Sequence, residues 1–447
     1  MRVYLTSLGC KLNYSEIEML ARRFARAGHQ PVSRPELADL CVVNSCAVTH
    51  VAARKSRQLI RRLHRTNPRA SIVVTGCYAE MFPERVRGIE GVELVVGNDH
   101  KEQLVGMVGQ RQEIEEGSSG TDDRGLGRGD RTRAFIKIQD GCNNRCTYCI
   151  VTLARGRERS RTPSEVLAEV HQRVATGYQE VVLTGVNVGA YGRDQGTDLV
   201  QLVRAILDET ELPRLRLSSI EPWEVKEELL TLWQDHRLCR HLHLPLQSGC
   251  DETLHRMGRR YTTAQYAALV DRARAAIPGL AVTTDLIAGF PGETQPEFVQ
   301  TRAFAERMAF ARLHVFPYSP RPGTQAAQLP DQVPPPVKKR RAQTLRAIGE
   351  EAGRAFRQRF VGRILCVLWE RTQDRHQVAS GLTDNYLRVY TNGQEALINT
   401  ITPVQLTHLH NQGLWGQLLE TSSEFAPELR LWRGAARLMQ EADNGQC

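Results

Sequence analysis

The chain has 447 residues, enough for about two to four domains, each with its own hydrophobic core. It has no signal-peptide architecture and no apolar run near the ~18 residues that cross a bilayer, which argues against a membrane partner. Eleven cysteines without a secretion signal favour the reducing cytoplasm, where thiols bind metals, and a net charge of +9 suits a polyanionic partner.

Three short apolar runs, each followed by a cysteine, mark the first part of the chain, residues 1–110. The runs are Val3–Leu5, Leu40–Val43 and Ile72–Val74, and the cysteines are Cys10, Cys46 and Cys77. Helix-like stretches separate the runs, and a further strand-like run follows at 92–96, so we expect a parallel α/β domain. The carboxyl ends of parallel strands share one edge of the sheet, so the three cysteines are predicted to meet in a metal site. Ordinary buried cysteines are the alternative.

Residues 111–133 are polar and rich in glycine, which predicts a flexible linker. From 134 to 355, strand-like runs alternate with helical stretches. The runs are 134–138, 180–184, 214–218, 241–244, 281–286 and 312–316. Strands that alternate with helices predict a parallel sheet, here a partial six-stranded (β/α) barrel. Such barrels carry their chemistry at the carboxyl ends of the strands.

The first of these six runs leads into Cys142, Cys146 and Cys149, spaced as Cys-x-x-x-Cys-x-x-Cys. A structural zinc site or an electron-transfer cluster would normally have four protein ligands, whereas three thiolates leave one iron of a [4Fe–4S] cube open. An open iron can bind S-adenosylmethionine through its amino and carboxylate groups. The spacing is typical of radical S-adenosylmethionine enzymes; a zinc site completed by a distant His is the alternative.

The loops after the six strands are polar and marked by glycine or proline, and we expect them to line one shared site. Tyr148 is expected to help seat the adenine of S-adenosylmethionine, and Gly185 to allow close approach of its methionine part. The candidate cofactor-binding residues are Tyr148, Gly185, Asn187, Ser218, Ser219, Glu221 and Gln247. Ordinary turn chemistry is the alternative for any single loop.

Basic residues occur in three blocks, two of them next to the predicted cluster loops. The residues that we expect to contact RNA are Arg54, Lys55, Arg57, Arg61, Arg155, Arg157, Lys338 and Arg341. A phosphate backbone held against the active site explains this placement. A solvated helix face is the alternative for each block.

Residues 356–420 change to short β-rich runs, at 364–368, 387–390, 396–398 and 415–418, with a turn expected at 381–386. This pattern predicts a small antiparallel barrel of a kind that often binds RNA. We interpret the tail, 421–447, as a packing segment with an amphipathic helix.

Several motifs together resemble the methylthiotransferase family of radical S-adenosylmethionine enzymes over residues 1 to about 420. They are Leu8-Gly-Cys-Lys-Leu-Asn13, Asn44-Ser-Cys-Ala-Val-Thr49, Thr75-Gly-Cys-Tyr-Ala79, the Cys142 segment with its arginines, Leu183-Thr-Gly-Val-Asn187, His243-Leu-Pro-Leu-Gln-Ser-Gly249 and Asp285-Leu-Ile-Ala-Gly-Phe-Pro-Gly-Glu-Thr294. The C-terminal barrel resembles the family's TRAM domain. Lys11, Leu12 and the Ser218–Pro222 segment resemble the branch that acts on N6-threonylcarbamoyladenosine in tRNA. One departure is Thr152, where the family usually has proline.

The resemblance implies two [4Fe–4S] clusters, one on each cysteine set, and S-adenosylmethionine used in two ways. The Cys142 set would generate a 5′-deoxyadenosyl radical, and the Cys10 set would hold the sulfur that is inserted at adenine C2 and methylated. It also implies the tRNA anticodon stem-loop as partner, with no DNA, and an electron donor of the flavodoxin or ferredoxin kind. The alternatives are isopentenyladenosine tRNA, a ribosomal protein, or a metal-bound RNA-binding protein without catalysis.

Overall fold

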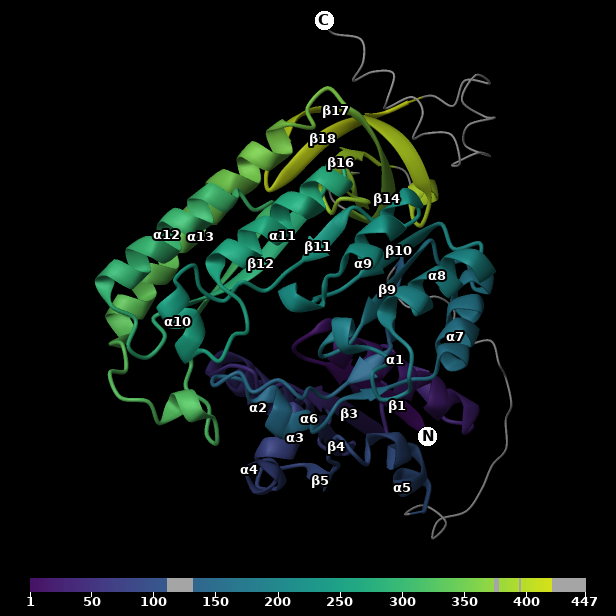
Figure 1. The fold of residues 1–447 in the computed structure, drawn as a ribbon. Coiled ribbons are helices and arrows are strands. Elements are labelled where there is room, and N and C mark those ends of the chain that lie inside the picture. Colours follow the sequence, from purple (N-terminus) through teal and green to yellow (C-terminus); the bar gives the residue numbers. More distant parts are fainter. Residues whose placement is uncertain (111–131, 374–377, 394, 420–447) are drawn as a thin grey trace, which may run out of the picture.

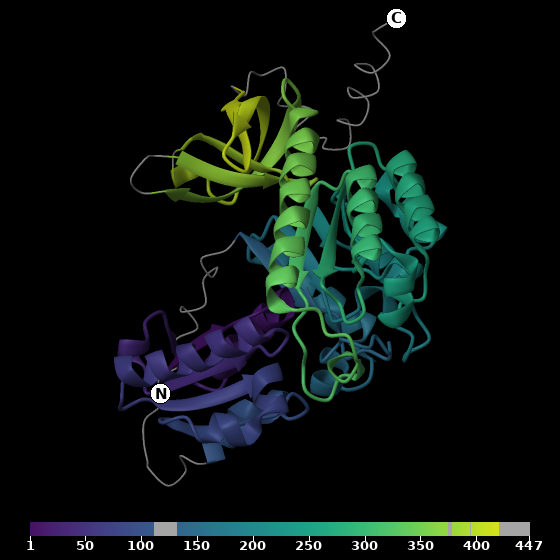
Figure 2. The same ribbon diagram turned by 90° about the vertical axis from the view of Figure 1, so that its left-hand side faces the viewer.

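The computed structural model describes residues 1–110, 132–373, 378–393 and 395–419. The predicted linker and the predicted tail therefore lie almost entirely outside the described residues. In both views the first sheet lies at the bottom and the C-terminal barrel at the top, with the central barrel between them (Figures 1 and 2). In the described part of the chain, no helix is both long and apolar enough to cross a membrane.

The first part is a five-stranded parallel sheet in the order β2-β1-β3-β4-β5. Its elements are β1 (Arg2–Ser7), α1 (Lys11–Arg26), β2 (Gln30–Val32), β3 (Leu40–Ser45), α2 (His50–Thr66), β4 (Ser71–Gly76), α3 (Cys77–Met81), α4 (Pro83–Arg87), β5 (Val92–Val95) and α5 (Leu104–Gln110). The central strands β3 and β4 are buried on both faces, which their continuous apolar runs predict. The sequence did not reveal β2, a three-residue edge strand that contains a proline.

The central part is the predicted partial barrel of six parallel strands. They are β6 (Arg133–Lys137), β9 (Glu180–Thr184), β10 (Arg214–Leu217), β11 (His241–His243), β12 (Ala281–Ala288) and β13 (Arg312–Pro317). The strands form two three-stranded sheets, β10-β9-β6 and β11-β12-β13. Isolated parallel bridges, such as that between Ser219 and His243, join β10 to β11. The fold prediction for this part is confirmed.

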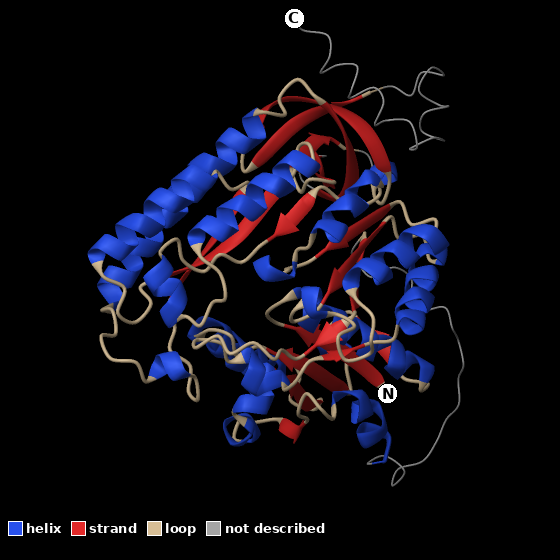
Figure 3. Cartoon of the chain, viewed as in Figure 1, coloured by secondary structure: helices blue, strands red, loops and turns tan. Residues whose placement is uncertain are grey.

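Helices cover the outside of the central strands (Figure 3). They are α7 (Pro163–Ala175), α8 (Leu199–Glu209), α9 (Glu227–Leu230), α10 (Asp251–Arg256), α11 (Thr263–Ala276), α12 (Gln295–Met308) and α13 (Pro335–Gln358). Threonine capping boxes start α7, α11 and α12, so the sequence itself fixes where these helices begin. The loop between β6 and α7 contains β7 (Gln139–Asp140), α6 (Val151–Arg155) and β8 (Arg159–Ser160).

The third part is a closed barrel in the order β14-β15-β16-β18-β17. Its strands are β14 (Ile364–Gln373), β15 (Val378–Thr383), β16 (Arg388–Asn392), β17 (Ile401–His410) and β18 (Gly413–Leu418). All neighbouring strands are antiparallel except the parallel pair β16–β18. The small barrel was predicted correctly, although some of its strands were not.

Three details of this barrel correct the sequence prediction. The expected strand at 396–398 overlaps a short 3-10 helix, Glu395–Leu397, and β17 was not expected. Gly381 lies inside β15 rather than in a turn. A Cβ at Gly381 would overlap the Leu368 carbonyl oxygen, so this glycine serves close packing between strands, not a reversal of the chain.

Candidate active site

The cysteines of the first part follow the carboxyl ends of β1, β3 and β4, and the structure brings them together. Cys10 precedes α1, Cys46 follows β3, and Cys77 begins α3. A Cβ at Gly9 would lie 2.8 Å from Cys46 Sγ, and Gly9 has a φ of +109°, so only glycine fits beside that thiol. Burial, with smaller contributions from Cys77 and Cys10, raises the pKa of Cys46 to about 11.

Cys142, Cys146 and Cys149 lie together in the loop between β7 and α6. The backbone N–H of Cys149 donates to the Cys146 carbonyl (3.1 Å), so the chain turns tightly around the site. The N–H of Thr147 donates to the Met257 carbonyl (3.0 Å) and anchors the loop to the barrel. Burial raises the pKa of Cys142 to about 11 and that of Cys149 to about 12. Since a thiolate is the ligand form, cluster binding releases these protons.

A pocket of about 220 Å³ lies between the two cysteine loops. We call it the cysteine pocket; its lining includes Val48 and Thr49 from the Cys46 loop, Tyr148 and Cys149 from the other loop, and Gln247, Asp285, Ile287 and Phe316 from the barrel. The N–H of His50 donates to Ser319 Oγ (3.2 Å), which ties the first domain to the barrel at its rim. One molecule in the pocket therefore lies within reach of both cysteine loops.

The candidate cofactor-binding residues lie at the carboxyl ends of the barrel strands. The side chain of Asn187 is buried with no hydrogen bond to either polar atom, and Ser218 Oγ and Asn144 Nδ2 are also unpaired. Tyr148 packs edge-to-face against Phe290, with ring centroids 6.4 Å apart. Buried polar groups without partners are costly, so these atoms fit a polar ligand such as S-adenosylmethionine. That ligand supplies hydroxyl, amino and carboxylate groups.

The remaining candidate cofactor-binding residues lie at the same carboxyl end of the barrel. Gly185 faces Gln139, where a Cβ would lie 3.0 Å from the carbonyl oxygen, and Ser219 bridges to β11. Gln247 has a left-handed φ of +67° and lines the cysteine pocket. Glu221 is held by Arg259, a residue that the sequence analysis missed.

Arg259 binds both a candidate cofactor residue and a cysteine. It forms a two-nitrogen ion pair with Glu221, and its Nη1 lies 3.6 Å from Cys146 Sγ. Its guanidinium carbon Cζ also lies over the ring of Trp223, 4.8 Å from the ring centroid. Arg259 comes from the loop after α10, more than 100 residues from Cys146, so local sequence gave no signal for it.

A buried charge network joins the two cysteine loops. Arg155, only 2% exposed, donates to Glu16 (2.8 Å), Asp140 (2.9 Å) and Asn13 (2.7 Å). Asn13 Oδ1 in turn lies 3.8 Å from Cys10 Sγ, and Asp140 precedes Cys142 by two residues. Arg155 therefore connects the loops internally, which corrects the prediction that it contacts RNA.

Arg341 is also buried, and it pairs with Glu293 at 2.6 Å, so it too is unavailable to a phosphate. Lys338 is half-buried over the ring of Tyr318, 4.8 Å from its centroid. The other predicted RNA contacts are more open: Arg54, Lys55, Arg61 and Arg157 are exposed, whereas Arg57 donates to the Tyr78 hydroxyl at 3.1 Å. The exposed face of α2 is therefore the strongest remaining candidate for RNA contact.

Two family models match the chain. The one described as "Radical SAM superfamily" matches residues 136–305, and "Uncharacterized protein family UPF0004" matches residues 2–97. Among solved structures, the radical S-adenosylmethionine methyltransferase TsrM from Kitasatospora setae gives a TM-score of 0.55 at 16% identity, over 73% of this chain and 75% of that one. The fold and the matched model define a radical S-adenosylmethionine protein.

Relatives identify the family within that class. The Bacillus subtilis protein named "Threonylcarbamoyladenosine tRNA methylthiotransferase MtaB" is 38% identical over 95% of this chain and 98% of its own. A Thermotoga maritima protein of the same name is 38% identical over 82% and 86%. The Geobacillus kaustophilus "tRNA-2-methylthio-N(6)-dimethylallyladenosine synthase" is 32% identical over 97% and 85%. The chain belongs to the tRNA methylthiotransferase family of radical S-adenosylmethionine enzymes.

Proposed function

We propose that this protein inserts a methylthio group at C2 of N6-threonylcarbamoyladenosine next to the tRNA anticodon. The observation that carries the proposal is the cysteine pocket, which is lined by Val48 and Thr49 of the Cys46 loop in the first domain and by Cys149 in the barrel. Two relatives named for threonylcarbamoyladenosine are 38% identical to this chain, whereas four named for the dimethylallyl nucleoside are 32–34% identical, which supports the first substrate over the second. When bound, two [4Fe–4S] clusters and S-adenosylmethionine supply the radical, sulfur and methyl chemistry.

The pocket suits this chemistry because the adenine C2–H bond is unactivated and a general base cannot remove its hydrogen. The protein's task is then to position the base and exclude water. Val48, Ile150, Ile287 and Phe316 supply an apolar lining beside Cys149. A base in the anticodon loop must leave its stack to enter such a pocket, as in other enzymes that modify nucleobases.

The chain's own residues then hold the reactants. Asn187 and Ser218 offer unpaired buried polar atoms to S-adenosylmethionine, and Arg259 keeps Glu221 oriented beside Cys146. The exposed basic face of α2 and the C-terminal barrel are suited to the phosphates of the anticodon stem. We propose action in the cytoplasm, with a flavodoxin- or ferredoxin-like electron donor.

Mass spectrometry of nucleosides from total tRNA, with and without the gene, tests the proposal. We expect loss of the methylthio group from threonylcarbamoyladenosine alone. Loss from isopentenyladenosine instead would keep the reaction and overturn the substrate. No change in either nucleoside would contradict the proposed function.

The cysteine sets are tested separately with purified, reconstituted protein. Cys10→Ala should retain 5′-deoxyadenosine formation but lose methylthiolation, and Cys146→Ala should lose both. Iron and sulfide near eight of each per chain are expected for the unaltered protein. Methylthiolation by Cys10→Ala would contradict the assignment of two sites.

A further inference from the structure

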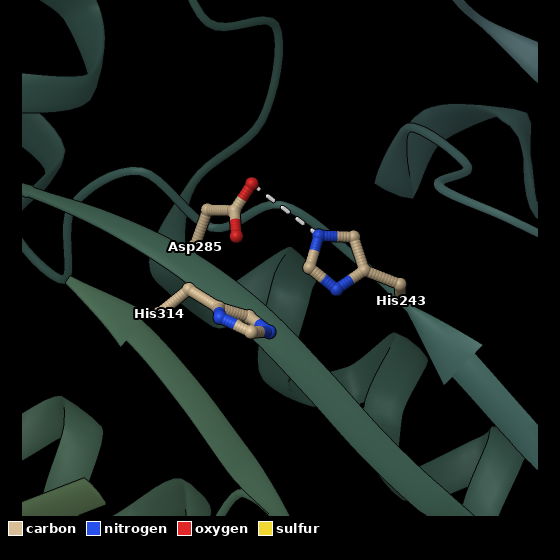
Figure 4. A group of neighbouring side chains, drawn as sticks. All are labelled: His243, Asp285 and His314. Atoms are coloured by element: carbon tan, nitrogen blue, oxygen red, sulfur yellow. Dashed lines mark ion pairs between the residues drawn. The ribbon is translucent and has the colours of Figure 1, made fainter. Parts of the chain in front are cut away.

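Three polar side chains on neighbouring strands face one another inside the central barrel: His243 on β11, Asp285 on β12 and His314 on β13 (Figure 4). Their potential ligand atoms all lie within 4.8 Å of one another, and His243 Nε2 is 3.3 Å from Asp285 Oδ2. Thr283 Oγ1 binds the other ring nitrogen of His243 at 2.9 Å and fixes the ring. We call these three residues the polar triad.

The polar triad stands between two hollows of the protein. Asp285 lines the cysteine pocket, where it lies with Cys149 and Gln247. His314 lines a larger groove of about 1050 Å³ on the side of β13, between α13 and the C-terminal barrel. Five arginines and two glutamates also line this groove: Arg312, Arg346, Arg354, Arg357, Arg388, Glu350 and Glu351. The arginines outnumber the acids, so the charge of the groove suits a nucleic-acid backbone. The triad is therefore placed where a substrate from the groove would meet the active site.

Lys11 adds a basic group near the triad. Its ammonium lies 5.7 Å from the ring centroid of Tyr386, a residue that also lines the groove. Among the described residues, the Lys11 ammonium makes neither a side-chain hydrogen bond nor an ion pair within 4 Å. Tyr386 stacks on His241, with ring centroids 4.6 Å apart. Thr283 Oγ1 contacts both His241 Nε2 (3.0 Å) and His243 Nδ1 (2.9 Å), so a continuous chain of contacts leads from Lys11 to the triad. A half-buried ammonium has lost part of its hydration, and an anionic ligand would offset that cost.

The substrate proposed above carries such an anion. The threonylcarbamoyl group on N6 ends in a carboxylate and also presents a hydroxyl and ureido N–H groups. The bonds from C2 and C6 of adenine to their substituents diverge, so an adenine with C2 toward the cysteine loops directs N6 elsewhere in the site. The polar triad and Lys11 offer the complementary groups: imidazole and ammonium donors for the carboxylate, and the Asp285 carboxylate for the N–H and O–H donors.

We propose that Lys11 and the polar triad bind the threonylcarbamoyl side chain, with Lys11 and His314 at its carboxylate, and so determine which modified adenosine is accepted. This inference rests on the proposed function. Two histidines and one carboxylate can also hold a divalent cation. Arg312 lines the groove together with His314, and Lys11 lies at Tyr386 in the same lining, so two positive charges near the Asp285 carboxylate favour an anion over a cation at this position.

The test measures binding directly, separately from catalysis. Cluster-loaded full-length protein is titrated with three anticodon stem-loop RNAs, which carry threonylcarbamoyladenosine, the same nucleoside with its carboxylate converted to a primary amide, or unmodified adenosine. We expect the carboxylate RNA to bind about 10- to 100-fold more tightly than the amide, as one or two charge-assisted hydrogen bonds predict. Lys11→Gln and His314→Ala should abolish this preference, while Lys11→Arg, which keeps the charge, should retain most of it.

Lys226→Gln is the matched control, because Lys226 is an exposed lysine at the start of α9. It should keep the wild-type preference. Iron content and melting temperature show whether Lys11→Gln, next to Cys10, still folds and binds its clusters. In turnover, the Lys11 and His314 substitutions should raise KM for the threonylcarbamoyl RNA more than they lower kcat.

Several outcomes separate this inference from the proposed function. Equal binding of carboxylate and amide RNAs by the wild type would overturn the inference, even if the protein methylthiolates its substrate. A strong preference without methylthiolation would leave the inference intact and overturn the proposed reaction. An equal loss of affinity for both RNAs in the variants would assign the residues a structural role. One equivalent of a non-iron divalent metal, lost in His314→Ala, would identify a metal site instead.

Discussion

Glu16 holds together the charge network between the two cysteine loops, and its replacement by glutamine is the most informative single change. The carboxylate is 1% exposed and accepts from Lys101 (2.6 Å), Lys137 (3.0 Å) and Arg155 (2.8 Å). Glutamine keeps the shape of the side chain but removes its charge. It would also turn an NH₂ group toward a cation. Arg155 and Lys137 would then share Asp140 as their remaining carboxylate. Lys101 would keep only the Asn44 amide oxygen.

The expected loss of stability follows from this imbalance. Removing one partner from a buried ion pair costs about 3–5 kcal/mol, because the other charge keeps its burial cost. For a cooperative unit of roughly 150–250 residues, this corresponds to a fall in Tm on the order of 10 °C. Function should suffer further, because Arg155 would no longer be fixed between Asn13 and Asp140. Less methylthiolated tRNA should form for each 5′-deoxyadenosine released.

Thermal melts of cluster-loaded protein, with Glu93→Gln as the control, provide the assay. Glu93 is an exposed acid on β5 of the same domain, so its change should leave Tm almost unaltered. Burial alone would raise the pKa of Glu16, but Arg155, Lys101 and Lys137 outweigh it and hold the pKa well below its usual value. The stabilising effect is therefore complete above about pH 4.3, the usual glutamate pKa, and is lost as the pH falls through the lower folded value. If Glu16→Gln melts with the control and keeps the product ratio, the reasoning is refuted.

Three further predictions concern other contacts. Burial opposes ionisation of Tyr386, but Lys11, Arg133 and Arg216 lower its pKa to about 8. As the pH rises from 8 to 10, the free energy of unfolding of the wild type should therefore increase by about 2–3 kcal/mol relative to that of Tyr386→Phe, measured by urea titration. A difference that stays constant over this pH range would contradict the prediction. Arg259→Lys loses the paired bonds to Glu221, so 5′-deoxyadenosine should form about 10- to 100-fold more slowly at unchanged iron content. In a plot of the logarithm of the tRNA binding constant against the logarithm of salt concentration, Arg61→Ala should reduce the magnitude of the slope by about 0.7–0.9. Arg341→Ala should lower stability and leave that slope unchanged. Equal slopes for the two variants would refute the assignment of Arg61, and not Arg341, to phosphate contact.

The sequence predicted the longer strands of the first two parts, because each of them is a short apolar run whose composition indicates burial. It did not predict the edge strand β2 or the two-residue strands β7 and β8. The six expected barrel strands lie within one or two residues of those observed. The cysteines needed one further rule, that parallel strands share an edge, and the structure brings each set of three together. The C-terminal barrel was harder to read. β17 contains Pro403 and β15 contains Gly381, residues that usually interrupt a strand, and they fit here because of their neighbours in the barrel.

The charged residues of the site were less predictable, since a charge shows its role only through its partner. Arg155 follows the cysteine loop in a basic block, yet its partner Glu16 lies 139 residues earlier in the chain. The partner of Arg341, Glu293, is 48 residues away. The members of the polar triad are also distant in sequence, because they come from three different strands, so no local pattern predicts that they meet. A basic block thus gives the composition of a surface, and only the fold decides which of its members face solvent.

The buried charges also explain how two domains can share one reaction. An apolar interface between the first domain and the barrel would stabilise their contact, but dispersion and the hydrophobic effect carry little directional information. Arg155 instead makes bonds of defined geometry to Asn13 near Cys10 and to Asp140 near Cys142. Hydrogen bonds in a buried network are satisfied in only one arrangement, so they fix the separation and angle of the two cysteine loops. Because sulfur insertion requires one adenine to meet both loops, we infer that the charge network serves this alignment rather than stability, since apolar replacements of buried ion pairs are often at least as stable.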